Sequence, residues 1–399
     1  MQDIWWHIHS LMPVRYAAQV ACMSQDFRHS WRYHPNLTFS EETLGLNGNV
    51  CGKDDKTRYF TDRVDNILKK HSGIGMEELN LSVSSMNEKY NFPCTLLSGG
   101  VGDSLRRLVL VACDFYPTES CCLRSLTRLK LYAVHILEDN LMCLFSNTCA
   151  LEWLELRQCN SIIHLKIPCL QKLSYLGVSF CFGLQLIESK APNLCSFSFA
   201  GGRRVQLSLG DTLRIKKLNR SCINAALYAR TELPSSMPNL ETLTLCSDGE
   251  RLNTPMMPSR FLHLRFLCIT ICGVAYDLLS LVSFFHASPS LETFILSVSQ
   301  HPSYPSGLRM MHEHQYDKLK SVQIINFSSN KSLVELTCHI LKSATCSVSK
   351  SGKCLLMRTE ALVEARRAAL AIQTYIQSKV PSAVELNVLE PCSQCHAEL

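Results

Sequence analysis

Cysteine is the residue type that most readily suggests chemistry in this sequence, and one cluster has the spacing of metal ligands. The chain has 21 cysteines among 399 residues. Cys392, Cys395 and His396 form a Cys-x-x-Cys-His pattern. A structural zinc site needs four ligands and usually joins two such pairs, and no second Cys-x-x-Cys lies at a suitable distance. We therefore expect no metal site and no cofactor, and we interpret residues 391–399 as a tail, with zinc binding as the alternative.

The motifs of the common enzyme classes do not occur in the sequence. It contains no P-loop, no glycine-rich dinucleotide fingerprint and no Gly-x-Ser-x-Gly nucleophile turn. With so many Cys and His residues, a Cys/His pair arises by chance and does not indicate a thiol protease. We expect that the chain is not an enzyme and has no catalytic residues. A metal- or thiol-dependent enzyme is the least favoured of the hypotheses.

The elements that would position a site are built from one short phrase, Leu-x-x-Leu-x-Leu. It is clearest from Leu151 to Leu156, and copies begin at residues 105, 126, 151, 173 and 194, which are 21, 25, 22 and 21 residues apart. A further exact copy begins at residue 240, the copies at 173 and 194 are looser, as are those at 76, 264 and 291, and two weaker candidates begin at 215 and 319. The Leu-x-Leu alternation has the period of a β-strand, so both leucines point to one face. One unit cannot bury that face alone, and this spacing is typical of stacked leucine-rich repeats.

The composition limits the class and compartment of the protein. Cys113 and Cys159 stand where such a repeat has its Asn or Cys, and buried thiols of this kind favour a reducing compartment, the cytoplasm or the nucleus. No secretory signal and no membrane-spanning stretch is visible, so we expect no membrane association. The net charge of +6 is mild and dispersed. We therefore expect no nucleic acid partner.

The N-terminal residues resemble an F-box. Ile4, Ile8 and Leu11 form one stripe of a helix, and the pattern continues through Pro13 and Val14. A second part, Ala21-Cys22-x-Ser24-x-x-Phe27-x-x-Ser30-Trp31, also matches. The Leu-Pro pair that opens the motif in relatives is missing, so the F-box is shortened at its N-terminus. The resemblance implies that a Skp-type adaptor of an SCF ubiquitin ligase binds Ile4, Ile8, Leu11, Pro13 and Val14.

The C-terminal residues resemble the FBD region of plant F-box proteins. The pattern runs from Leu319-Lys-Ser-Val322 to Ser332-Leu-Val-Glu-Leu, which begins a helix at 332–342. A longer helix is expected at 360–379 and a short closing strand at 384–388. Taken together, the chain resembles a plant F-box/leucine-rich-repeat/FBD protein. The expected parts are a helical F-box-like motif at 1–40, a linker and capping helix at 41–75, repeats at 76–310, an FBD-like region at 311–390 and the tail at 391–399.

These parts define an α/β fold: a leucine-rich-repeat solenoid with parallel strands on its concave face, a small N-terminal helical F-box and a C-terminal α+β cap. Binding is expected on the concave face, where side chains between the core leucines point outward. Trp, Tyr and Arg are the residues that most often anchor interfaces. The candidate target-binding residues are Arg107, Arg128, Lys130, Tyr132, Trp153, Glu155, Arg157 and Tyr175.

The resemblance and the repeats favour one function and leave one alternative. The favoured function is a substrate-recognition adaptor of an SCF-type ubiquitin ligase, which binds the Skp adaptor and, through it, the cullin, while the repeats hold an unidentified target protein. The alternative is a leucine-rich-repeat interaction scaffold without ligase association.

Overall fold

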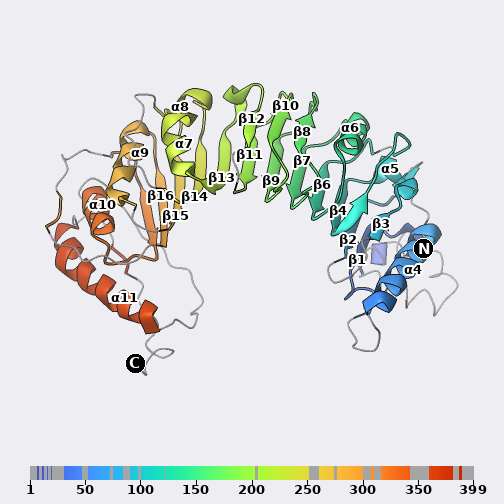
Figure 1. The fold of residues 1–399 in the computed structure, drawn as a ribbon, viewed down its shortest axis with the longest axis horizontal. Coiled ribbons are helices and arrows are strands. Elements are labelled where there is room, and N and C mark those ends of the chain that lie inside the picture. Colours follow the sequence, from blue (N-terminus) through green and yellow to red (C-terminus); the bar gives the residue numbers. More distant parts are fainter. Residues whose placement is uncertain are drawn as a thin grey trace. The chain divides into compact units, whose positions relative to one another are not determined.

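The chain forms two compact units, residues 1–211 (unit 1) and residues 212–399 (unit 2) (Figure 1). The computed structural model describes residues 7–8, 11–12, 16, 19, 31–46, 53–71, 75–83, 90–97, 100–121, 123–202, 205–250, 260–273, 276–299, 307–309, 316–341, 359–380 and 386–388. Of the predicted parts, the tail at 391–399 and most of the F-box-like motif therefore lie outside the described residues.

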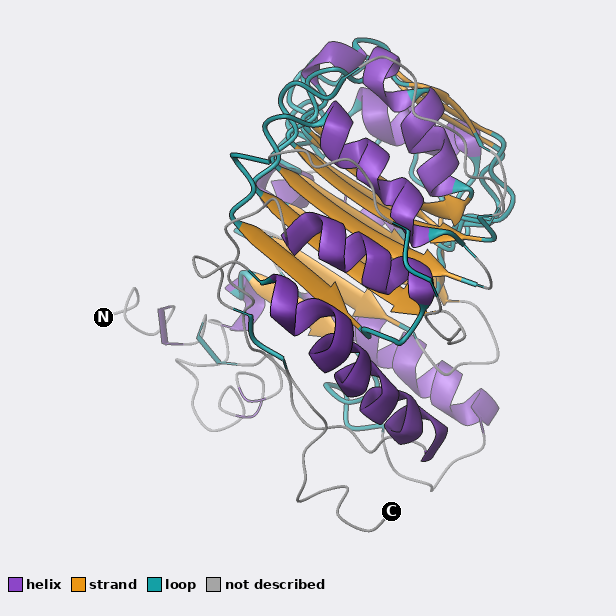
Figure 2. Cartoon of the chain, turned by 90° about the vertical axis from the view of Figure 1, so that its left-hand side faces the viewer, coloured by secondary structure: helices purple, strands orange, loops and turns teal. Residues whose placement is uncertain are grey.

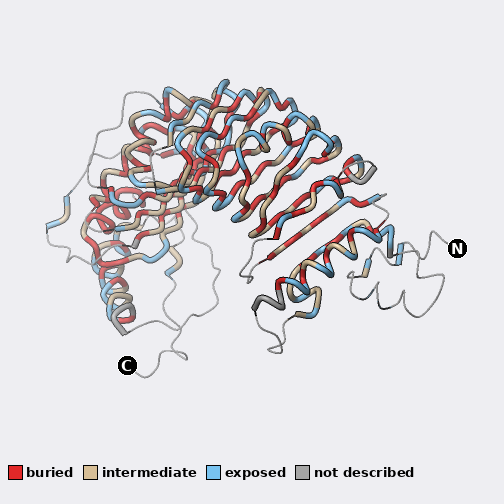
Figure 3. The backbone as a smooth tube through the Cα atoms, turned by 45° about the vertical axis from the view of Figure 1, so that its right-hand side comes forward, coloured by how far each residue is buried: buried red, intermediate tan, exposed pale blue. Residues whose placement is uncertain are grey.

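Unit 1 is built on a parallel sheet, to which each repeat contributes one strand. In spatial order the strands are β1 (Asn36–Phe39), β2 (Glu78–Ser82), β4 (Arg107–Val111), β6 (Arg128–Tyr132), β7 (Trp153–Arg157), β9 (Tyr175–Ser179) and β11 (Ser196–Ala200). The repeat leucines stand side by side across the sheet: Leu108, Leu129, Leu154 and Leu176 are in register and fully buried. Buried and outward residues alternate along these strands, except that Gly177 of β9 is also buried (Figure 3). The predicted strand period is confirmed.

A second layer covers the buried side of this sheet. It contains the three-stranded sheet β12 (Gln206–Ser208), β10 (Leu186–Ser189) and β8 (His164–Ile167), the pair β3 (Tyr90–Phe92) and β5 (Cys113–Phe115), and the helices η2 (Cys94–Leu97), α5 (Gly100–Ser104) and α6 (Glu138–Ser146). The described residues between 84 and 102 include β3, η2 and the start of α5. Tyr90 and Phe92 are buried on one side of β3, which pairs with β5 in parallel.

Four successive repeats of unit 1 turn out of their strands through a residue in the left-handed conformation. Ala112, Ala133, Gln158 and Phe180 follow the ends of β4, β6, β7 and β9, with φ between 54° and 56°. The backbone N–H of each donates a hydrogen bond to a carbonyl of the next strand, for example Gln158 to Ser179 at 2.9 Å. The conformation costs an L-residue free energy, and this repeated bond offsets part of that cost. The same turn therefore recurs at these four repeats.

Helix α4 (Lys53–Lys70) packs on the first strands of unit 1. This is the capping helix expected within residues 41–75, and it begins at Lys53. Phe60, Val64 and Leu68 are buried, and the Phe60 ring meets Tyr90 edge-on at 6.1 Å. The Tyr90 hydroxyl donates a hydrogen bond to Asp65 at 2.8 Å. Apolar packing thus holds the helix over the start of the repeats.

Unit 2 continues the same repeat plan with longer strands and more helix. Its sheet consists of β13 (Lys217–Ile223), β14 (Thr242–Asp248), β15 (Phe266–Cys272), β16 (Thr293–Ser299) and β17 (Ser321–Ile325). The helical segments are η3 (Thr212–Arg214), α7 (Ala225–Thr231), α8 (Leu233–Ser236), η4 (Leu278–Leu281), α9 (Val282–Ala287) and α10 (Lys331–Leu341). Helices of this unit lie against its strands in Figure 2. Residues 332–341 of α10 are all buried, so this helix is a core element.

The C-terminal residues form a helix and no strand where described. Helix α11 (Thr359–Ala371) continues into a π-helical turn, η5 (Ile372–Ile376), and a 3₁₀ turn, η6 (Gln377–Lys379). Leu362, Ala368, Ala371 and Ile376 form its buried stripe. The strand expected at 384–388 is not formed by residues 386–388, whose side chains are half-buried or exposed. Alternation over so few residues was too short to fix a strand without a neighbour in register.

Candidate functional site

All eight predicted target-binding residues lie on the outward side of the unit 1 sheet, which we call the strand face. None of the eight is buried, whereas the leucines between them are. The register places Arg107, Arg128, Trp153 and Tyr175 in one row across β4, β6, β7 and β9. Lys130 and Glu155 share the second row. Tyr132 and Arg157 share the third row. The predicted neighbours therefore lie together.

Two aromatic rings form the centre of the strand face. The rings of Trp153 and Tyr175 are stacked, with centroids 3.5 Å apart and planes 13° from parallel. Such a pair contributes about 0.5–1.5 kcal/mol beyond the area it buries. The Trp153 Nε1–H is buried and has no hydrogen-bond partner within the described part of the chain. The stack is therefore held by ring contact rather than by polar bonds of the indole.

Gly177 makes room for this stack. An added Cβ at Gly177 would lie 2.8 Å from the Tyr175 hydroxyl oxygen, closer than real Cβ contacts. The Tyr175 ring therefore lies along its own strand, over the position where a side chain would stand. Burial is the main cause that raises the pKa of Tyr175, which keeps the phenol neutral. A glycine within a strand often marks such a close approach.

Part of the charge on the strand face is already neutralised. Lys130 Nζ lies 3.2 Å from Glu155 Oε2, with both side chains partly exposed. Burial, and then a hydrogen bond to Glu155, raises the pKa of Tyr132 to about 12. Arg107 pairs with Glu78 of the neighbouring strand β2. Exposed pairs of this kind contribute at most about 1 kcal/mol, so they fix side-chain positions more than they stabilise the fold.

Two exposed arginines contact aromatic rings instead of carboxylates. The Arg128 guanidinium carbon lies 5.9 Å from the Trp153 ring centroid. That of Arg157 lies 5.8 Å from Phe180. Within the described residues neither arginine forms an ion pair. Their positive charges therefore remain unneutralised on the strand face.

Sequence reasoning missed an aromatic pair beside Arg157. Phe180 and Phe182 are 40% and 54% exposed, and their ring centroids are 6.5 Å apart. The backbone N–H of Phe182 donates to Asn160 Oδ1 at 3.0 Å. The equivalent left-handed position carries alanine in two other repeats, so the turn does not require an aromatic ring at Phe180. Two exposed phenylalanines in one loop, Phe180-Cys-Phe182, were the signal that could have revealed them.

The predicted adaptor-binding residues are described only in part. Ile8 is 40% exposed and Leu11 is 73% exposed. Ile4, Pro13 and Val14 lie outside the described residues. The Met12 carbonyl accepts a hydrogen bond from the Nε2–H of buried His34 at 2.9 Å, because His34 Nδ1 accepts from the Asn36 N–H. This bond attaches the Leu11–Met12 turn to the beginning of strand β1.

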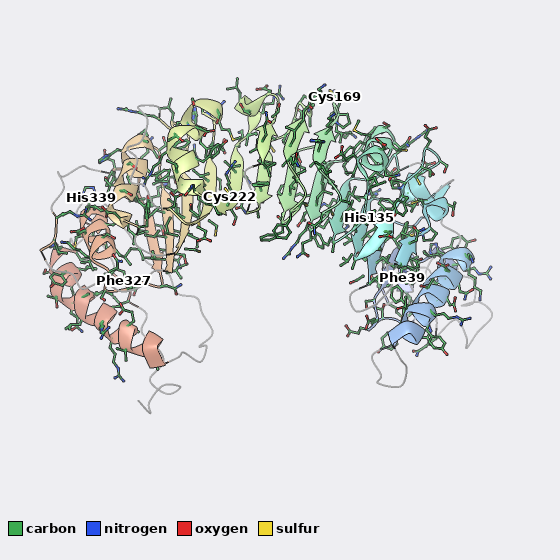
Figure 4. The ribbon with its side chains drawn as sticks, viewed as in Figure 1. Phe39, His135, Cys169, Cys222, Phe327 and His339 are labelled. Atoms are coloured by element: carbon green, nitrogen blue, oxygen red, sulfur yellow. The ribbon has the colours of Figure 1, made fainter. Side chains whose placement is uncertain are left out.

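Cysteine and histidine form no metal cluster in the portion of the chain that is described. No group of three or more His, Cys, Asp and Glu residues there could hold a metal ion. Cys392, Cys395 and His396 lie outside that portion. Cys113 and Cys159 are fully buried, as expected for the repeat position, whereas Cys169 is exposed and Cys222 is half-buried (Figure 4). The fourteen cysteines described are all free thiols.

Unit 2 contains a separate hollow of about 320 Å³. Phe285, Tyr316 and Leu319 are among its apolar lining residues, and Arg260 and Lys318 also border it. The Tyr316 hydroxyl bonds to His339 Nε2 at 2.9 Å, so this buried histidine is already satisfied. His286 and Ser288 also line the hollow.

One family model matches the chain over residues 40–393, and its description is "At1g61320/AtMIF1, LRR domain". The chain belongs to this plant leucine-rich-repeat family. The match includes the strands from β2 to β17 and helix α10. A search of curated proteins found no match.

The family membership and the strand face together indicate protein–protein interaction. The repeats supply a rigid parallel sheet, and the exposed aromatic and basic side chains on it are of the types that anchor protein interfaces. No helix among the described residues is long and apolar enough to cross a membrane.

Proposed function

We propose that this leucine-rich-repeat protein is a substrate-recognition adaptor of an SCF-type ubiquitin ligase. Its N-terminal segment would bind a Skp-type adaptor and thereby the cullin. The strand face would hold the target protein. The chain itself would perform no chemistry, because recognition brings the target close to the ubiquitin-transferring partners.

The observation that carries the target-binding part is the clustering of aromatic and basic side chains on one rigid sheet. Trp153, Tyr175, Arg128 and Arg157 come from three adjacent strands whose register holds them within reach of one another. Interfaces are dominated by a few such residues surrounded by weaker contacts. The strand face has this composition before any partner binds.

The adaptor part rests on the F-box resemblance of residues 1–31 and on two exposed apolar side chains. Ile8 and Leu11 are separated by three positions, so they belong to one side of a helical turn. Leu11 is 73% exposed, which is unfavourable unless a partner covers it. The bond between His34 and Met12 keeps this turn beside the repeats.

Co-purification tests the adaptor part directly. The full chain is expected to capture a Skp-type adaptor and cullin, and the double variant Ile8→Asp/Leu11→Asp to capture neither, because two charges would be placed on the apolar contact. The matched control is Leu213→Asp/Leu262→Asp, which alters two leucines of unit 2 that are both 57% exposed and should leave capture unchanged. A folded wild type that captures neither protein would leave the alternative, an interaction scaffold without ligase association.

A further inference from the structure

The strand face of unit 1 has an excess of unneutralised positive charge. Its outward strand residues include four cations, Arg107, Arg128, Lys130 and Arg157, and two carboxylates, Glu78 and Glu155. The two carboxylates pair with Arg107 and Lys130. The charges that remain are those of Arg128 and Arg157, which are exposed and contact only aromatic rings. A partner with negative charge at these two places would complement the surface.

The spacing of the two arginines selects the form of that partner. Arg128 on β6 is in register with Trp153 on β7, and Arg157 lies four residues further along β7. With about 3.3 Å per residue along a strand and about 4.8 Å between strands, their anchor points are roughly 14 Å apart. Side chains at i and i+4 of an extended peptide are about 13 Å apart on one side. Two carboxylates in an acidic-x-x-x-acidic pattern therefore match the spacing of the two arginines.

The aromatic residues beside Arg157 offer a third contact for the same acidic peptide. Phe180 and Phe182 expose their rings next to the Arg157 guanidinium and offer an apolar contact to a residue that follows the second carboxylate. Their loop is held in place by the bond from Phe182 to Asn160 and by a required glycine, because a Cβ at Gly183 would lie 2.4 Å from the Asn160 carbonyl oxygen. Rigid exposed aromatic rings lose little conformational entropy when a partner covers them.

We propose that the strand face of unit 1 binds an acidic extended segment of the target protein, with one carboxylate at Arg128, a second at Arg157 and an apolar side chain against Phe180 and Phe182. This inference rests on the proposed target-binding role of the face. It adds the chemical class of the segment that is recognised.

A peptide fits this surface better than a nucleic acid strand. Glu78 and Glu155 belong to the same face and would repel a phosphate backbone. The rings of Trp153 and Tyr175 already stack on each other at 3.5 Å, so no base can enter between them. Single-stranded nucleic acid binders instead present separate ring platforms along a continuous basic groove.

Selection from a random displayed peptide library on the immobilised full chain tests the proposal. The expected winners carry an acidic-x-x-x-acidic pattern followed by an aromatic or aliphatic residue. Anisotropy with the fluorescein-labelled winner should show at least roughly tenfold weaker binding for its twin with Gln in place of both acidic residues. The variant Arg128→Gln/Arg157→Gln should lose a similar factor for the winner.

The controls separate this proposal from the proposed ligase role. Arg124→Gln/Lys166→Gln removes two exposed charges outside the strand face and should bind the winner as the wild type does. The proposal would be overturned if no peptide were enriched or if the winners lacked carboxylates. It would also be overturned if the arginine variant bound the winner as well as the wild type does, or if single-stranded oligouridylate bound more strongly than the winner. Arg128→Gln/Arg157→Gln should still capture the Skp-type adaptor. Loss of adaptor capture by the wild type would overturn the ligase role alone.

Discussion

Two buried histidines of unit 1, His34 and His71, hold the residues that precede strand β1 in place. His71 is buried, and its Nε2–H donates to the His34 carbonyl at 3.0 Å. Burial is the main cause that lowers the pKa of His71 below its ordinary value. The ring is therefore neutral in the folded chain at neutral pH, and protonation would place a charge in a buried position.

The lowered pKa of His71 predicts how stability changes with pH. Below the ordinary pKa of 6.5, His71 binds a proton in the unfolded chain but stays neutral in the folded chain, where its pKa is lower. The free energy of unfolding should therefore fall as the pH is lowered through that value. Thermal melting of the full chain at several pH values measures this. His71→Asn should show a smaller loss of stability on acidification than the wild type. His263→Asn, at an exposed position, should keep the wild-type dependence; an equal slope in all three proteins would contradict the assignment.

The sequence predicts for each strand residue of the repeats whether its side chain points outward or into the core, because the strand period alone decides this. All eight predicted strand-face residues point outward, and Leu154 and Leu156 are fully buried. The contacts were not predictable. The stack of Trp153 on Tyr175 depends on the register between two strands and on the missing side chain of Gly177. A pattern within one strand carries no information on either.

At the scale of the element, a buried carboxylate fixes the start of helix α7. Glu250 is 4% exposed, and its Oε1 accepts hydrogen bonds from the backbone N–H groups of Ala226 at 2.8 Å and Leu227 at 3.1 Å. The Ser247 hydroxyl also bonds to Oε1. These N–H groups have no partner within the helix, and a negative charge is favourable at a helix N-terminus. Glu250 thus acts as a cap from a distant part of the chain.

Glu250→Ala should therefore loosen α7 specifically. The substitution removes the acceptor of the partly buried Leu227 N–H and one of the two acceptors of the Ala226 N–H, which keeps Ser247 Oγ at 3.1 Å. Loss of such an acceptor costs about 1–3 kcal/mol. Hydrogen exchange should show faster exchange in residues 225–231 than in the strands beside them. Glu232→Ala, which removes an exposed carboxyl group from the end of the same helix, is the control and should leave the exchange at Ala226 and Leu227 unchanged. Unchanged exchange at these two amides in Glu250→Ala would show that the cap does not hold the helix.

The elements themselves were predictable where the phrase was long and repeated. Ser332–Lys342 was expected as a helix, and α10 spans Lys331–Leu341. Short elements such as β3 and β5 were not expected, because three residues carry too little periodicity and pair only after the repeats have stacked. Arg220 shows the opposite case. It replaces the third leucine of a weak phrase, yet β13 still forms, and its guanidinium lies 3.8 Å over the Tyr228 ring.

The whole molecule has the energetics of a repeat protein. Each strand pairs only with its sequence neighbours in the stack, so stability is approximately a sum of repeat terms and nearest-neighbour terms. A core substitution in one repeat should therefore weaken that repeat and those beside it more than distant ones. The two compact units give this expectation a direct test.

Leu154→Ala should destabilise unit 1 around β7 by about 2–5 kcal/mol, because it removes a fully buried leucine and leaves a cavity. Hydrogen exchange is expected to accelerate most in β6, β7 and β9, and least in β14 to β16 of unit 2. Leu243→Ala is the matched variant: Leu243 is equally buried on β14, so its effect should centre on β13, β14 and β15. If either variant instead accelerated exchange uniformly over both units, the chain would unfold as one cooperative body. If the faster exchange stays local, a partner bound to the strand face of unit 1 should stabilise the repeats that it covers more than distant repeats.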